Sequence, residues 1–274
     1  MATLGQHAPS AKIRALIYSR SKVGKTFGAG SFPRLCVIDC DSGIRTLLGR
    51  EFIAQHGWHP EIEYEQFSEK GLNSRGVAQS HNAFDDVCRY FDKMMKPDKR
   101  GTFDTWVVDT GTSLSAFAMN KAYVLLGGTY KGVSSETLDQ ALKHGLVFPK
   151  LQDYGSERSM VEQFIGMLYH TDKNFLFMCH EKEVTDKAGN PTAIVPLLTG
   201  KGVEAICGLF DEVWNLRVKK SGPETIRYLQ TQPDGIRMAG SRDGYPDGML
   251  WNYKTVEAEH QKILALATTN KEKK

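Results

Sequence analysis

The sequence predicts an α/β fold in which helices cover both faces of a mainly parallel sheet. Two observations support this fold class. Apolar runs alternate with segments of helical period through the first 180 residues, an order typical of parallel sheets. The last third of the chain is rich in strand-like segments separated by glycine-containing turns, and is expected to add antiparallel strands.

Short apolar runs predict the strands in order along the chain. The runs with buried character are residues 12–19, 34–41, 102–110 and 174–181. Residues 61–67, EIEYEQF, alternate in polarity and predict an exposed strand. Two antiparallel hairpins follow, over residues 183–197 and 211–232.

Apolar residues at helical spacing predict the helices. They cover residues 44–57, 81–96, 113–127, 156–170 and 256–267, with Ser156 as a candidate N-cap. Residues 127–156 have no clear period and predict a long loop of the kind that is functional or disordered. We therefore divide the chain into a flexible tail (1–11), a core (12–255) and a C-terminal helix with a basic tail (256–274).

The composition indicates an ordinary globular protein. Of 274 residues, 41% are hydrophobic and 24% charged, and the formal net charge of +3 means that any DNA-binding surface must be local. The five cysteines lack C-x-x-C spacing and lie mostly in or beside apolar runs, which favours buried reduced thiols. The N-terminus has no apolar signal region, and no run approaches the roughly 18 apolar residues of a membrane span. We expect a cytoplasmic protein with no membrane partner.

The stretch LIYSRSKVGKTFGAG, residues 16–30, contains most of a phosphate-binding P-loop. In the motif G-x-x-x-x-G-K-[ST], Gly24, Lys25 and Thr26 match, and Ser19 takes the place of the first glycine. A strand precedes the loop and a helix follows it, so that backbone N–H groups would face phosphate oxygens, with Lys25 on the β- and γ-phosphates and Thr26 on Mg²⁺. A lone GKT also suits a surface turn. The expected nucleotide contacts are Ser21, Lys22, Val23, Gly24, Lys25, Thr26 and Phe27.

Polar side chains end three further strands at the same edge of the predicted sheet. Asp109 ends TWVVD, Asp41 follows CVID, and His180 ends FLFMCH. In open α/β sheets, ligands bind beyond the carboxyl ends of the strands, so Asp109 is expected to orient the Mg²⁺ beside Thr26. Two alternatives stay open: Asp109 could instead cap the next helix, and His180 could be a satisfied histidine at a strand end.

The order of the motifs resembles the core of RecA-type ATPases. In particular it resembles the phage-encoded RecA-like nucleotide-binding proteins of the Sak-type single-strand annealing group. The matching segments are IYSRSKVGKT, CVIDCDSG, FDTWVVDTGTSL, FLFMCHE and VPLLTGKGVEAICGLFDEVWNL. The resemblance implies that residues 12–255 form a RecA-like core that binds ATP and Mg²⁺ and hydrolyses ATP. It also implies that Asp41 activates the attacking water, where larger recombinases have Glu, and that His180 senses the γ-phosphate, where they commonly have Gln.

The segment AGSRDGYP, residues 239–246, resembles half of the K-x-R-x-G segment with which RecA-like subunits reach a neighbour's nucleotide. Arg242 matches the arginine, and Gly240 replaces the lysine. The resemblance implies that Arg242 is a catalytic arginine finger supplied in trans, which couples hydrolysis to assembly. Lys201 is the other basic candidate for the phosphate, and a solvated turn arginine is the plain alternative.

The resemblance further implies phage DNA recombination or strand annealing in the bacterial host's cytoplasm. The implied partners are single-stranded DNA, which would stimulate hydrolysis, further copies of the chain in a ring or filament, and a single-stranded-DNA-binding protein. Basic residues in segments 127–156 and 183–202 suit single-strand binding. The candidate DNA contacts are Lys131, Lys182, Lys187 and Lys201. Two other functions stay open: a P-loop kinase for a small molecule, and a nucleotide-binding assembly module with negligible hydrolysis.

Overall fold

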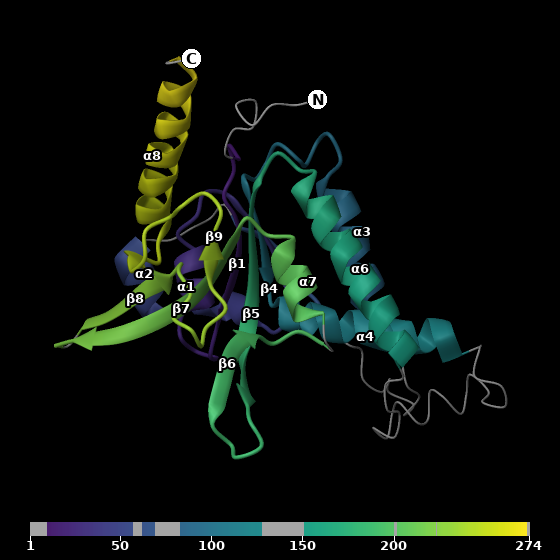
Figure 1. The fold of residues 1–274 in the computed structure, drawn as a ribbon. Coiled ribbons are helices and arrows are strands. Elements are labelled where there is room, and N and C mark those ends of the chain that lie inside the picture. The colour runs from purple at the N-terminus through teal and green to yellow at the C-terminus, as the bar shows by residue number, and fades with distance from the viewer. Residues whose placement is uncertain are drawn as a thin grey trace.

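A computed structural model describes residues 10–56, 62–68, 83–127, 151–199, 202–222 and 224–272. In this part of the chain, a twisted sheet lies between two layers of helices (Figure 1). None of the described helices is long and apolar enough to cross a membrane.

Six neighbouring strands form the parallel part of the sheet, in the order β7-β1-β5-β4-β2-β3. Their bounds are β1 Arg14–Ser19, β2 Leu35–Asp39, β3 Glu63–Gln66, β4 Thr105–Asp109, β5 Asn174–Thr185 and β7 Glu212–Ser221. The strand β1 therefore lies between β5 and β7, and its last residue, Ser19, is level with His180 of β5. The predicted α/β class with a mainly parallel sheet is confirmed.

Antiparallel strands extend the sheet, as expected for the C-terminal third. The strand β8 (Glu224–Gln230) pairs with β7, β10 (Met249–Leu250) pairs with β8, and β9 (Gly240–Ser241) pairs with β7. The strand β6 (Pro191–Pro196) pairs with the second half of β5. The β5–β6 and β7–β8 ribbons both project from the body (Figure 1).

Two hydrophobic clusters fasten the helices to the two faces of the sheet. Alternation along β1 sends Leu16 and Tyr18 into one cluster and Ala15 and Ile17 into the other. The first cluster includes side chains of α3 (Ala83–Met94), α4 (Gly111–Gly127), α6 (Leu151–Tyr169) and α7 (Val203–Gly208). The second includes side chains of α1 (Lys25–Ala29), the 3₁₀ helix η2 (Gly43–Leu48), α2 (Arg50–His56) and α8 (Tyr253–Glu272).

Three predictions of element bounds were wrong. The expected helix 44–57 is two elements, η2 and α2, because the backbone is extended at Gly49. The helix expected at 156 begins at Leu151, so Ser156 lies inside it rather than at its N-cap. The strand expected to end near His180 runs to Thr185, because the residues after His180 pair with β6. The long loop predicted over 127–156 lies mostly outside the described residues.

Candidate nucleotide-binding site

The loop between β1 and α1 has a backbone that suits its glycine. Gly24, immediately before α1, has φ +108, in the left-handed region that glycine adopts without strain. The space beside it is also filled: a Cβ atom on Gly24 would lie 2.3 Å from Nε of Arg227. The conformation therefore favours glycine at this position, and a larger residue would also have to displace the Arg227 side chain. Ser19, at the first position of the motif, is the last residue of β1 and is fully buried.

Lys25 lies with its ammonium group against the start of the loop. Its Nζ donates to Ser19 O, Ser19 Oγ and Arg20 O, each at 3.3 Å, and the residue is only 5% exposed. Burial lowers the pKa of Lys25, an effect that the nearby Asp109 carboxylate opposes. The serine in place of the first glycine thus supplies one acceptor for the P-loop lysine.

Thr26 and Asp109 meet at the end of β4. Thr26 Oγ1 donates to Asp109 Oδ2 at 2.6 Å, and Asp109 is 2% exposed. Burial raises the pKa of Asp109 to about 7; the hydrogen bond from Thr26 lowers it, and the carboxylates of Asp41 and Asp39 raise it further. A buried carboxyl next to two others is therefore only half ionised near neutral pH unless a cation joins the group.

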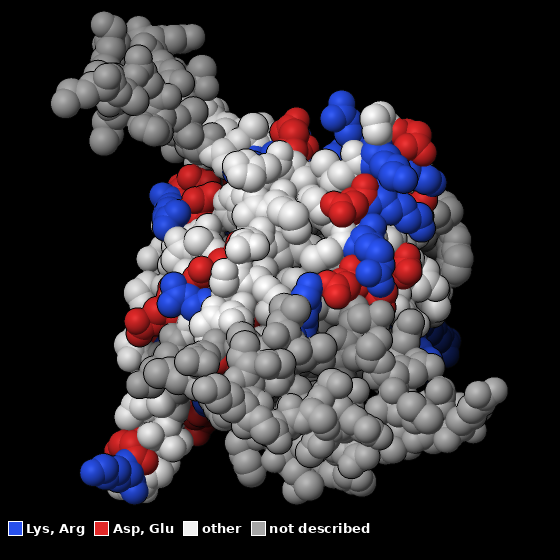
Figure 2. Space-filling model, turned by 90° about the vertical axis from the view of Figure 1, so that its right-hand side faces the viewer, with Lys and Arg blue, Asp and Glu red and all other residues white. Residues whose placement is uncertain are grey.

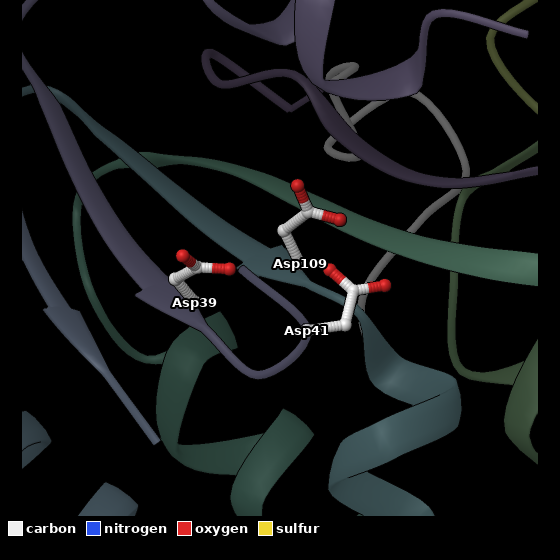
Figure 3. A group of neighbouring side chains, drawn as sticks. All are labelled: Asp39, Asp41 and Asp109. Carbon is white, nitrogen blue, oxygen red and sulfur yellow. The ribbon is translucent and has the colours of Figure 1, made fainter. Parts of the chain in front are cut away.

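The carboxylates of Asp39, Asp41 and Asp109 lie close together at the ends of β2 and β4 (Figure 3). One oxygen of each lies within 4.8 Å of the others. Carboxylate and hydroxyl oxygens are the hard ligands that Mg²⁺ prefers, so the donor set at this point fits that ion. The residues that could hold Mg²⁺ next to the bound phosphates are Thr26, in the P-loop motif, and Asp109, its hydrogen-bond partner.

Asp39 was not assigned a role from the sequence, and the structure gives it one. Its carboxylate accepts from Gly43 N at 2.8 Å, from Ile44 N at 3.4 Å and from Gln66 Nε2 at 3.0 Å. These bonds fix the turn between β2 and η2, the turn that carries Asp41. Asp39 is a positioning residue, and its signal in the sequence was the pair of acids in IDCD.

Asp41 and His180 face each other at the same edge. His180 Nε2 lies 3.3 Å from Asp41 Oδ2, and both side chains are partly accessible to solvent. The backbone of His180 is held by Thr112, at the start of α4: His180 N donates to Thr112 Oγ1 at 3.0 Å, and that hydroxyl donates to Leu197 O at 2.7 Å. Thr112 thus fixes the backbone of His180, which is level with Ser19 at the start of the P-loop.

These side chains line one cavity of about 570 Å³. Of the residues proposed from the sequence, those on its wall are Ser21, Lys22, Gly24, Lys25, Thr26, Phe27, Asp41, Asp109 and His180. Val23 is not on the wall; its side chain packs against the core and its carbonyl faces Arg227. The structure therefore brings together the proposed phosphate, metal and water-activating groups, whose chemical roles stay predictions.

The remaining predicted residues lie elsewhere. Arg242 lies near the amino ends of the parallel strands, beside the first residues of β7. There its guanidinium group donates to Asp211 Oδ1 at 3.1 Å and to Gly208 O at 2.9 Å. Lys182 is on β5, and Lys187 lies in the turn of the β5–β6 ribbon. Lys131 and Lys201 lie outside the described residues.

Arg227 of β8 is a cavity residue that the sequence did not reveal. Its guanidinium carbon lies 4.3 Å from the centroid of the Phe27 ring, Nε donates to Val23 O at 3.3 Å, and Nη1 contacts Glu51 Oε1 at 3.1 Å. More than 200 residues separate it from the P-loop, and no local pattern distinguishes it from the other arginines. Only the pairing of β8 with β7, and of β7 with β1, brings it there.

A P-loop of this form, with a carboxylate at the end of a parallel strand beside its threonine, defines the chain as a P-loop NTPase. The profile of the family described as AAA domain (AAA_24) matches residues 11–242, and the chain belongs to that family. Among solved structures, the KaiC-like protein of the hyperthermophilic archaeon Pyrococcus horikoshii OT3 is similar at 12% identity and a TM-score of 0.39, over 80% of this chain and 77% of that one. No curated protein sequence gives a significant match.

Proposed function

We propose that the protein binds ATP with Mg²⁺ in the 570 Å³ cavity and hydrolyses it. The observation that supports this most is that two pairs line the same cavity: Thr26 with Asp109, and Asp41 with His180. The first pair suits a metal-bound phosphate, and the second suits an attacking water. A site that only binds nucleotide has no need of the second pair.

The phosphate-binding groups are those of the loop. Backbone N–H groups of residues 22–26 and the start of α1 would contact the phosphates, with Lys25 adding a positive charge on the β- and γ-phosphates. Thr26 and Asp109 would hold Mg²⁺, which when bound neutralises charge on the β- and γ-phosphate oxygens. Lys25 must leave the carbonyls of Ser19 and Arg20 to reach them, a small movement for a flexible side chain.

In hydrolysis, Asp41 and His180 would act on the attacking water and the γ-phosphate. Asp41 accepts a proton from a water molecule, whose oxygen bonds to the γ-phosphorus while the bond from that phosphorus to the β–γ bridging oxygen breaks. The products are ADP and inorganic phosphate. His180, held 3.3 Å from Asp41, orients that carboxylate and offers a contact to the γ-phosphate. Aspartate is one methylene shorter than the glutamate of larger recombinases, so His180 compensates by fixing its direction.

The proposal is tested by two variants compared in the same assays. Lys25→Ala removes the P-loop charge and should weaken ATP binding at least about tenfold, as expected for a charged hydrogen bond. Asp41→Asn should retain ATP binding and lower turnover about 10²-fold or more, the usual contribution of a general base. Equilibrium binding of a fluorescent ATP analogue and release of inorganic phosphate measure the two effects. Unchanged binding in Lys25→Ala, or unchanged turnover in Asp41→Asn, would contradict the assignment.

We further propose that this ATPase works on single-stranded DNA as an oligomer in recombination or strand annealing. The motif order supports this part. The β5–β6 ribbon supports it little, because Lys182 and Lys187 share that ribbon with Glu181, Glu183 and Asp186. The β7–β8 ribbon is more basic and exposes Lys219 and Lys220, with Lys219 5.7 Å from the Tyr228 ring. On the side of α3 and α6, the described positive and negative side chains are interspersed (Figure 2).

ATP turnover with and without an oligonucleotide tests the DNA part. We expect single-stranded DNA to raise the rate of ATP turnover. The double variant Lys219→Glu/Lys220→Glu should reduce this stimulation more than Lys182→Glu/Lys187→Glu, because Lys219 and Lys220 lie on the more basic ribbon. A rate that ignores DNA would favour the alternatives. Transfer of the γ-phosphate to a small acceptor would identify a kinase, and slow turnover with ATP-dependent assembly would identify an assembly module.

A further inference from the structure

A second cavity adjoins the first on the side of Phe27. It measures about 640 Å³, and it shares Phe27, Glu51 and Arg227 with the P-loop cavity. Its other walls come from α2, β8 and the segment after β10. Among the polar and aromatic residues on these walls are Gln55, His56, Thr225, Trp251 and Asn252.

Arg227 and Glu51 stand at the junction of the two cavities. Arg227 is held from three directions, by the Phe27 ring, the Val23 carbonyl and the Glu51 carboxylate. Its side chain is mostly buried, whereas that of Glu51 is largely exposed. A planar cation is therefore fixed at the outer side of the P-loop, next to the residue that follows Thr26.

The direction of a bound nucleotide follows from the loop. In a P-loop the lysine reaches the β- and γ-phosphates, and the amides at the start of the helix cradle the α- and β-phosphates. The terminal phosphate would therefore lie toward Asp41 and His180, and the α-phosphate toward Phe27. The ribose and base follow the α-phosphate. They would therefore leave the first cavity on the side where the second cavity opens.

We propose that the second cavity binds the nucleoside half of the nucleotide and that Arg227 is the residue whose planar face contacts the base. The inference rests on the proposed function of the first cavity. A guanidinium group stacks on aromatic rings and is less strongly hydrated than an ammonium group, so it can cover a base at little cost in hydration. The amides of Gln55 and Asn252 supply donors and acceptors of the kind that read the edge of a base. The volume is within the range of small-ligand pockets.

Two ligands separate a base contact from a phosphate contact. Mg²⁺-ATP carries both halves, whereas Mg²⁺-tripolyphosphate carries the phosphates alone. We expect Arg227→Ala to weaken ATP binding about tenfold or more, in the range measured for base stacking, and to leave tripolyphosphate binding within about twofold. Arg227→Lys keeps the charge and loses the plane, so it should show nearly the same loss for ATP. Isothermal titration of the full chain measures both ligands with the parent and with each of the two variants.

Two controls make the result specific. Arg237 is also partly buried and paired with an acid, Asp234, but lines neither cavity, so Arg237→Ala should bind both ligands as the parent does. Lys25→Ala should lose both ligands; if it binds both normally, the proposed function fails and not merely the nucleoside site. Equal losses of ATP and tripolyphosphate in Arg227→Ala would make Arg227 a phosphate contact, and no loss would make it structural; either result overturns the proposal.

A measurement on the unmodified protein covers the case in which Arg227→Ala does not fold. Photolysis with 8-azido-ATP, whose reactive group is on the base, should label peptides from α2, β8 or residues 250–252. Excess ATP should suppress the label, and excess tripolyphosphate should suppress it as well, because both occupy the P-loop. Labelling confined to other segments would contradict the placement of the base.

Discussion

At the scale of a single residue, Asp109 is both buried and expected to bind a metal ion as a carboxylate. Its carboxyl group must be buried to close the site around Thr26, and burial raises its pKa to about 7. Asp41 and Asp39 add to the rise because they bring negative charge within a few ångströms. A divalent cation beside Asp109 would offset this negative charge, so a proton and the metal compete for the Asp109 carboxylate.

This competition predicts a pH dependence of Mg²⁺ binding. The pKa of Asp109 is about 7, so at lower pH its protonated form dominates. The proton must then leave before the carboxylate can hold the ion. The apparent affinity for Mg²⁺ in the presence of ATP should therefore fall roughly tenfold between about pH 8 and pH 6. Titration of nucleotide binding with Mg²⁺ at fixed ATP measures it.

Asp109→Asn is the matched variant. It keeps an acceptor for the Thr26 hydroxyl but has no proton to lose, so its Mg²⁺ affinity should be weaker and nearly flat over the same pH range. A parent protein without the pH dependence, or an Asp109→Asn variant that retains it, would show that another group controls binding.

At the scale of elements, α4 and α6 enclose a polar cluster within the hydrophobic layer. Ser115 of α4 donates to Glu157 of α6 and contacts Thr199 Oγ1 at 2.6 Å, and Glu157 is 1% exposed. Burial raises the pKa of Glu157 to about 7, while the Ser115 hydrogen bond lowers it and Glu162 raises it. The group is thus more readily protonated in the folded chain than in the unfolded one.

The sign of the stability effect follows from linkage. Between the unfolded pKa near 4.5 and the folded pKa near 7, the native state holds a proton that the unfolded state has lost, so the free energy of unfolding falls as pH rises through this window. Glu157→Gln removes this term. The stability of the parent relative to Glu157→Gln should decrease by ~1–3 kcal/mol between pH 4.5 and pH 8. Urea denaturation at both pH values checks this, and equal pH profiles would contradict it.

Elements with strong local signals could be predicted from the sequence. The buried strands β1, β2, β4 and β5 are apolar runs, and each was found at its place, because such runs gain most from burial in the middle of a sheet. The break at Gly49 and the start of α6 at Leu151 were missed. Tertiary packing decides such boundaries, and helical period alone does not locate them.

Some residues of the candidate site could be predicted from the sequence, and others could not. Lys25, Thr26, Asp41, Asp109 and His180 could be gathered in advance, because parallel strands deliver their carboxyl ends to one edge. Asp39 and Arg227 could not be given their places. Their contacts are set by a turn and by an antiparallel strand whose register appears only in the folded chain.

At the scale of the whole molecule, the P-loop cavity and Arg242 lie at opposite ends of the parallel strands. The P-loop cavity lies at the carboxyl edge, where the β5–β6 and β7–β8 ribbons project (Figure 1). Arg242 lies at the amino edge, next to Glu212, which pairs with Ala15 at the beginning of β1. Its side chain is 60% exposed and its ion pair with Asp211 is at the surface, where such pairs contribute only ~0–1 kcal/mol.

Opposite edges meet when subunits associate head to tail, the contact that generates rings and filaments. In such an assembly Arg242 of one subunit could leave Asp211 and face the nucleotide of the next. We therefore predict that Arg242→Ala lowers ATP turnover about 10³-fold or more, as removal of a trans arginine finger does, without weakening ATP binding by the isolated chain.

Mixing experiments distinguish a trans arginine from a cis one. Arg242→Ala and Lys25→Ala chains should each be inactive alone. When they are mixed, some interfaces join an intact P-loop to an intact Arg242, so part of the turnover should return, and the restored fraction should fall on dilution because it depends on subunit contact. Arg227→Ala provides the control: Arg227 contacts the P-loop of its own chain, so mixing with Lys25→Ala leaves no site with both residues. The higher ATP concentration that Arg227→Ala needs for turnover should therefore stay unchanged on mixing. Only a severalfold loss in Arg242→Ala, or no rescue by Lys25→Ala, would leave Arg242 as a surface residue paired with Asp211.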